Sequence, residues 1–124
     1  MGLLSRLSGH ASEVDLEKLQ NEIHPTLVRG EELQKAYKVF RDIFVFTNRR
    51  LILVDKQGLN GKKVEYLSLP YKSITRFSVE TAGTFDRDSE LKIWVSGDPE
   101  PIEKEFRKGT DILGLQKTLA HYVL

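Results

Sequence analysis

Apolar and polar residues alternate with a period of two through most of residues 33–107, which is the pattern of β-strands. The pattern breaks at residues 43–55, where two apolar runs, 43–46 and 51–54, flank the polar segment 47–50. Short apolar runs on either side of an Asn-bearing turn predict a β-hairpin. Neither run alternates, so both faces of this hairpin carry large apolar side chains and both must be covered.

The alternating segments around the hairpin predict five further strands, at residues 33–40, 64–69, 75–80, 91–95 and 102–107. Two regions have helical spacing instead. Residues 13–23 predict a short helix that ends before Pro25. After Gly109, an apolar stripe of Ile112, Leu115, Leu119 and Tyr122 predicts an amphipathic helix, with Thr110 as its N-cap.

Seven short antiparallel strands followed by one helix predict a mainly β protein, in which two curved sheets close toward a barrel and the helix plugs an open end. The periodicity alone leaves a β-sandwich open. The chain of 124 residues is long enough for a real core and predicts a single domain overall. Within it we distinguish an N-terminal helical extension at 1–30 from the barrel at 31–124, whose capping helix spans 110–124.

Three stretches of the chain, residues 46–55, 69–77 and 90–95, resemble the bacterial pleckstrin-homology (PH) domain family. They read FTNRRLILVD, LPYKSITRF and ELKIWV, and the similarity extends over nearly the whole chain. The resemblance implies a seven-stranded bent barrel capped by a C-terminal helix. It also implies a binding or scaffolding role without a known reaction, and ring-like homo-oligomers. We therefore expect a cyclic homo-oligomer, for which a pentamer is one candidate, with other proteins as further candidate partners.

The charge balance excludes some partner classes. The 19 basic and 18 acidic residues give a net charge of +1. Residues 39–80 hold 8 basic and 4 acidic side chains, an excess of 8 − 4 = +4 that is too small for a nucleic-acid footprint. The chain has no cysteine, which fits a reducing cytoplasm, and no apolar run approaches the roughly 20 residues that span a bilayer. We expect a cytoplasmic protein.

Candidate chemistry is sparse. His10, His24 and His121 are scattered over three segments without cysteine, so neither a metal site nor a catalytic triad is indicated. The segment 58–63 departs from a phosphate-binding loop, because its spacing is short and a strand follows. We therefore expect no catalytic residue, no cofactor and no metal, and we interpret the chain as a non-enzymatic scaffold or protein-binding module whose biological role stays open.

The hairpin supplies a candidate oligomer interface. If Phe44, Phe46, Ile52 and Val54 share one face, that quartet or the opposite one must point out of the barrel, and the pattern does not decide which. Leaving four such side chains in water forgoes roughly 6–12 kcal/mol, so a neighbouring subunit is expected to cover them. Trp94 lies on the face of its strand opposite to the buried residues, and it is the candidate anchor for the neighbouring subunit. Cover by the N-terminal helix would account for Trp94 equally well.

The alternative function is recruitment to a membrane through anionic lipid headgroups. Headgroup-binding PH domains place several basic residues in the connection between the first two strands, whereas this chain has only Arg41 and Asp42 there. Specific lipid binding is therefore disfavoured. Four basic residues near the hairpin and the next connection are the candidates for weak contacts with an anionic surface: Arg49, Arg50, Lys62 and Lys63.

Overall fold

A computed structural model of the chain describes residues 16–39, 42–57, 63–81, 89–107 and 111–124. The described helices are α2 (Leu16–Ile23) and α3 (Ile112–Val123), with short 3₁₀ turns η1 (His24–Thr26) and η2 (Tyr71–Ser73). The strands are β1 (Leu33–Val39), β2 (Asp42–Thr47), β3 (Arg50–Gln57), β4 (Lys63–Pro70), β5 (Ile74–Glu80), β6 (Ser89–Val95) and β7 (Ile102–Phe106).

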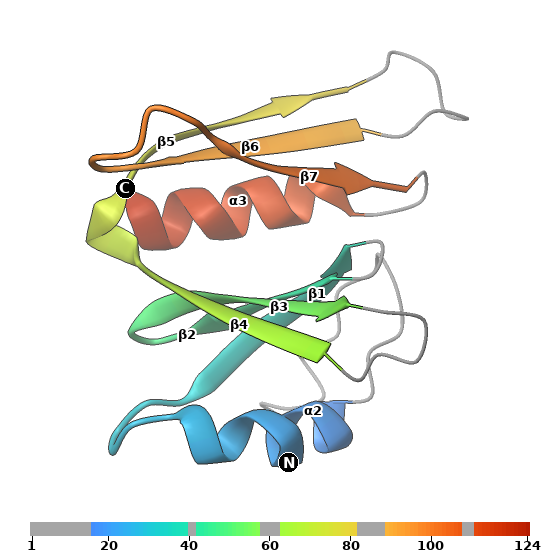
Figure 1. The fold of residues 1–124 in the computed structure, drawn as a ribbon, viewed down its shortest axis with the longest axis vertical. Helices are drawn as coiled ribbons and strands as arrows, with labels where there is room; N and C mark the ends of the chain where they lie inside the picture. Colours follow the sequence, from blue (N-terminus) through green and yellow to red (C-terminus); the bar gives the residue numbers. More distant parts are fainter. Residues whose placement is uncertain (1–15, 40–41, 58–62, 82–88, 108–110) are drawn as a thin grey trace.

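The strands form two antiparallel sheets, with the orders β1-β2-β3-β4 and β5-β6-β7. Figure 1 shows α3 between the two sheets and α2 on the far side of the four-stranded sheet. The predicted fold class, a mainly β chain with seven strands and a C-terminal helix, is confirmed. Neither described helix is long and apolar enough to cross a membrane.

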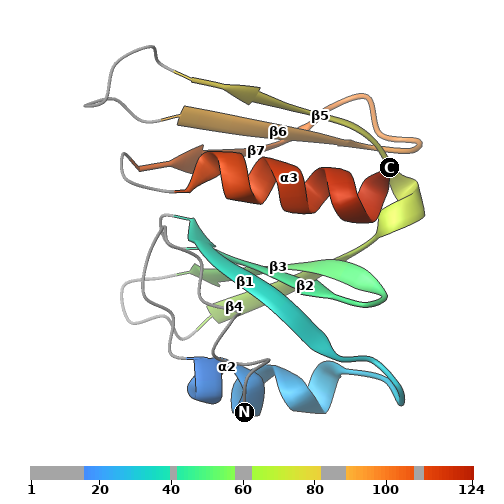
Figure 2. The same ribbon diagram turned by 180° about the vertical axis from the view of Figure 1, so that it is seen from behind.

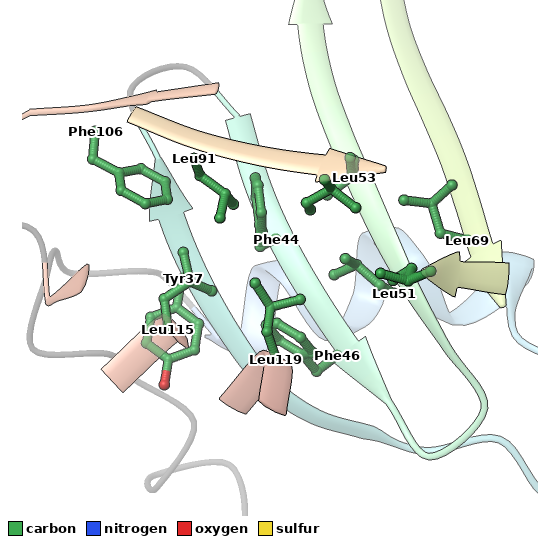
Figure 3. Close-up of a cluster of buried hydrophobic side chains, with 12 residues drawn as sticks. Tyr37, Phe44, Phe46, Leu51, Leu53, Leu69, Leu91, Phe106, Leu115 and Leu119 are labelled. Atoms are coloured by element: carbon green, nitrogen blue, oxygen red, sulfur yellow. The ribbon is translucent and has the colours of Figure 1, made fainter. Parts of the chain in front are cut away.

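The β2–β3 hairpin forms as predicted, with only Asn48 and Arg49 between its strands. Its register places Phe44 opposite Leu53 and Phe46 opposite Leu51. Residues directly opposite each other in an antiparallel pair point to the same face. These four side chains therefore share one face, which packs against α3 and the second sheet in what we call the inter-sheet core (Figure 3).

The opposite face of the hairpin carries Val45, Ile52 and Val54, which are at most 1% exposed. They pack against Leu19 and Ile23 of α2 in a second core. The supposition that the two phenylalanines share a face with Ile52 and Val54 is wrong, because the two-residue turn fixes a register that separates them. Both apolar faces are covered within one chain.

Helix α3 fills the space between the sheets through Leu115 and Leu119, both fully buried. Asp111 caps the helix by accepting a hydrogen bond from Gly114 N at 3.0 Å. The expected cap, Thr110, lies outside the described residues.

An aromatic stack closes the end of the inter-sheet core near the C-terminus of α3. The Tyr122 ring lies between Phe46, at 5.6 Å, and Tyr71, at 4.7 Å between centroids. The Tyr71 hydroxyl donates to Thr47 O at 2.6 Å. Burial raises the pKa of both tyrosines above the usual value, so their phenols stay neutral in the folded chain.

Candidate functional site

A buried carboxylate holds the hairpin turn in a structural joint. The side chain of Glu31 is inaccessible to solvent and accepts from Thr47 Oγ1 at 2.7 Å. Arg50 donates to the same carboxylate through Nε at 2.8 Å and Nη2 at 2.9 Å. Val28 N adds a fourth bond at 3.1 Å. Burial raises the pKa of Glu31, but the bonds from Arg50, Thr47 and Val28 outweigh it and hold the pKa below its ordinary range.

Asn48 fastens the same turn to the chain that precedes β1. Its side-chain oxygen accepts from Glu32 N at 2.7 Å, and its amide nitrogen donates to Gly30 O at 3.0 Å. Gly30 has φ +84°, a conformation that favours glycine. Thr47, Asn48 and Arg50 therefore hold the connection from α2 in place, and that role accounts for all three residues.

The four basic residues predicted to meet an anionic surface do not form one patch. Arg50 is committed to Glu31, and Lys62 lies outside the described residues. Arg49 and Lys63 are exposed, but they flank opposite ends of β3, because Arg50 pairs with Pro70 and Gln57 with Lys63. Seven residues of strand separate those ends by about 23 Å. The structure thus leaves two isolated cations in the described part of this region.

Four of the five predicted interface residues lie in the interior of the chain. Phe44 and Phe46 belong to the inter-sheet core, and Ile52 and Val54 lie beneath α2. Their exposures of 0–1% leave no surface for a neighbouring subunit. The hairpin separates two cores, so α3 and the second sheet cover one of its faces and α2 covers the other.

Trp94, the fifth, lies at the surface of β6 and is half-buried. The guanidinium carbon of Arg76 lies 4.3 Å from the indole centroid, a cation–π contact across the β5–β6 pair. Beside these two residues is a hollow of about 400 Å³, whose other lining residues are Thr75, Val95, Ser96, Gly97, Asp98 and Pro99. Helix α2 packs on the other sheet, so it does not cover Trp94 (Figure 1).

The outer face of the β5-β6-β7 sheet is polar apart from Trp94. Lys92 lies between Glu90, at 3.5 Å, and Glu103, at 3.9 Å, and all three are at least partly exposed. Sequence reasoning singled out Trp94 from its place off the buried alternation. It missed Arg76, because only the strand register reveals that the two side chains stack.

A second hollow, of about 450 Å³, lies between β1 and α3. Its lining residues are Gln34, Lys35, Gly114, Lys117, Thr118, His121 and Tyr122. We call it the β1–α3 groove. Sequence reasoning did not find it, because Lys35 and Lys117 are far apart in the chain and only the packing of α3 along β1 brings them together.

Two neighbouring carboxylates lie where the two sheets meet, and we considered them as a candidate acid–base pair. Asp42 pairs with Asp55 across β2 and β3, and Lys104 of β7 donates to Asp42 at 2.8 Å. Burial and the neighbouring Asp55 raise the pKa of Asp42, against the opposing effect of Lys104. None of the three lines either of the two hollows described above, and the Lys104–Asp42 ion pair ties the two sheets together. Within the described segments, no group of three or more His, Asp or Glu residues could hold a metal ion.

Comparison with known proteins gives a consistent family. A model of the bacterial PH domain matches residues 2–123. The uncharacterised protein YjqA of Bacillus subtilis is 54% identical over 121 residues, 97% of each chain. Two solved structures are similar throughout. The pleckstrin-homology domain from Shewanella amazonensis is 62% identical, with a TM-score of 0.84 and 98% of each chain covered. A PH-domain protein of the DUF1696 family from Shewanella loihica is 58% identical, with a TM-score of 0.79 over 94% of this chain and all of its own.

Proposed function

Since this chain belongs to the bacterial PH domain family, we propose that it is a non-enzymatic, self-assembling protein-binding module in which the Trp94 face seats a second copy of the chain. By the Trp94 face we mean the outer face of the β5-β6-β7 sheet around Trp94 and Arg76. The observation that carries the proposal is the unequal cover of the two sheets. Helix α2 buries the outer face of the four-stranded sheet, whereas no described helix lies on the outer face of the three-stranded sheet.

The pair of Trp94 and Arg76 suits an interface. Trp and Arg are enriched among the residues that dominate binding energy. Their stacking holds both side chains in place before a partner arrives, which lowers the entropy lost on association. The adjacent hollow of about 400 Å³ offers a recess for a protruding side chain.

A second copy is the favoured occupant because two edge strands of this chain, one in each sheet, are suited to pair with each other. Among the described strands, β4 pairs only with β3, and β5 pairs only with β6. The two edges match in length, at 8 and 7 residues, and an exposed edge is a template for another strand. Lys63 and Glu65 on β4, and Arg76 and Glu80 on β5, give each edge one exposed cation and one exposed anion.

A contact between the β4 edge of one copy and the β5 edge of the next, beside the Trp94 face, joins two different surfaces. Such a heterologous contact closes into a ring or continues as a filament. A closed cyclic homo-oligomer is the form we propose, and a pentamer is the candidate number. A cytoplasmic location fits this role and the lack of cysteine.

Recruitment to a membrane is the second candidate, and the geometry disfavours it. The connection between β1 and β2 spans only residues 40–41, and Asp42 beside it pairs with Lys104. Arg49 and Lys63 stand at opposite ends of the sheet. One exposed base near an anionic membrane contributes about 1 kcal/mol, so separated cations give weak binding without headgroup selectivity.

The test is the solution mass of matched variants by size-exclusion chromatography with light scattering. We expect Trp94→Ala and Arg76→Glu to shift the mass toward the monomer. The control is Leu113→Ala, which removes an apolar side chain that is 67% exposed on α3, and it should leave the mass unchanged. Circular dichroism confirms that each variant is folded. Equal masses for the wild type, both Trp94-face variants and the control would contradict the proposal.

A further inference from the structure

The β1–α3 groove is a surface that the self-assembly proposal does not use. Its two walls are Gln34 and Lys35 of β1 and one face of α3, from Gly114 to Tyr122. Figure 2 shows β1 at the front of the four-stranded sheet, with α3 above that sheet. The Tyr122 hydroxyl donates to the Gln34 side-chain oxygen across the floor. The hydroxyls of Tyr37 and Thr118 are hydrogen-bonded at 2.9 Å and tie the same strand to the same helix. The groove is therefore a pre-formed feature of the folded chain.

The groove is basic. Lys35, Lys117 and His121 are exposed along it, and its lining contains no Asp or Glu. Neither lysine has an ion pair with another described residue. Lys35 Nζ lies 6.0 Å from the Tyr37 ring centroid, which keeps the cation beside the groove. An anionic group placed here meets cations on both walls without a competing carboxylate.

The strand wall is an open edge. Among the described strands β1 pairs only with β2, and none of the described backbone hydrogen bonds reaches its other edge. Gln34 has no partner in the β1–β2 register, so the strand is irregular at this position. The Gln34 side chain turns toward the helix, where it accepts the hydrogen bond from Tyr122. An open edge beside a groove is the arrangement in which an extended peptide adds to a sheet, with main-chain bonds for affinity and side-chain pockets for specificity.

The spacing of the cations favours a strand over a small free anion. Lys117 and His121 are four residues apart on α3, so they lie about 6 Å apart along the helix axis. Alternate side chains of a strand repeat at about 6.8 Å and point to one face. An extended segment with acidic side chains at alternate positions would therefore present carboxylates to the cations of both walls, whereas a small anion would use only part of the groove.

We infer that the β1–α3 groove binds an extended segment of a partner protein that carries acidic residues at alternate positions, as an added strand on the open edge of β1. This binding is independent of the Trp94 face, which belongs to the other sheet. A self-assembled ring would then display one such peptide site on each subunit.

The experiment selects peptides from a displayed library of random dodecamers on the wild-type chain and measures each recovered peptide by fluorescence anisotropy. The test variant is Lys35→Glu with Lys117→Glu. The control, Arg49→Glu with Lys72→Glu, makes the same charge change at two exposed sites outside the groove. We expect peptides enriched in Asp and Glu, at least a tenfold loss of affinity in the test variant, and less than a twofold change in the control.

Hydrogen exchange locates the bound peptide. We expect slower exchange at alternate backbone amides of β1 when a recovered peptide is bound, because those amides gain hydrogen-bond partners. Recovery of no peptide, equal loss of affinity in test and control variants, or binding without protection of β1 would each overturn the inference. So would binding of citrate or inorganic phosphate, lost in the test variant, together with no peptide binding, because that result identifies a small-anion site.

Discussion

The Glu31→Gln substitution tests how the hairpin turn is fastened. It removes the negative charge that two Arg50 nitrogens, the Thr47 hydroxyl and Val28 N all contact, at distances of 2.7–3.1 Å. The glutamine has nearly the same shape, so the hydrophobic cores stay filled. The guanidinium then loses its counter-charge while it remains held against the turn.

The expected cost follows from the burial of the pair. Removing one partner of a buried ion pair costs about 3–5 kcal/mol, because the other charge is left uncompensated. The Arg50 side chain is 23% exposed, so water recovers part of that loss, and we expect about 2–4 kcal/mol. At roughly 3–6 °C per kcal/mol for a chain of this length, the melting temperature should fall by about 6–24 °C.

The assay is urea denaturation followed by circular dichroism, with every variant at one fixed concentration because self-association makes apparent stability depend on concentration. The neighbouring Glu32→Gln is the matched control, because its side chain is exposed and only its backbone N–H bonds to Asn48. The control should stay within about 0.5 kcal/mol of the wild type. A Glu31→Gln variant as stable as the control would refute the assignment of the carboxylate as the centre of the joint.

The pH dependence adds an independent check. The folded chain lowers the pKa of Glu31 from its ordinary value of 4.5, so the ionised form is favoured by folding. Its contribution is fully present above pH 4.5 and is lost as the pH falls through the lower folded value. The stability difference between the wild type and Glu31→Gln should therefore shrink on acidification below pH 4.5. A difference that stays constant down to pH 2 would contradict a charge-based joint.

Three further predictions concern the core, the tyrosines and lipid binding. Leu115→Ala should destabilise the chain by about 2–5 kcal/mol in urea denaturation. The control Leu113→Ala removes an exposed leucine from the same helix and should cost less than about 0.5 kcal/mol. Equal effects would contradict the packing of α3. Burial raises the pKa of Tyr71 and Tyr122, so the contribution of their neutral phenols to stability is fully present below pH 10 and is lost as the pH rises above it. Ultraviolet titration should show these phenols ionising only as the chain unfolds. Normal titration of all four tyrosines in the folded chain would refute this. In liposome sedimentation at physiological salt we expect no headgroup-selective binding, and micromolar, headgroup-selective binding would reverse the preference for a protein partner.

The strand pattern of this chain was readable because each half-buried strand alternates, as in β5 and β7. The lack of alternation in the hairpin also indicated correctly that both of its faces are covered. The assignment of side chains to those faces went wrong, because it depends on the length of the turn. A turn of Asn48 and Arg49 pairs Phe46 with Leu51, and a slip of one residue would exchange the faces.

The candidate site was less predictable, since its residues are assembled by tertiary packing. Trp94 could be identified from its position off the buried alternation, but its stacking partner Arg76 could not. Glu31 looked like a turn residue, and nothing local shows that Arg50, 19 positions later, neutralises it. The β1–α3 groove likewise depends on the path of a helix that lies about 80 residues beyond its strand wall, a separation that local patterns do not encode.

The self-association of the unmodified chain is the central claim, and sedimentation velocity over a concentration series tests it most directly. We predict a discrete species whose mass is an integral multiple, greater than one, of the 14.2 kDa chain, and which dominates throughout the micromolar range. A single species of 14.2 kDa, unchanged up to high micromolar concentration, would contradict the proposed assembly through the Trp94 face.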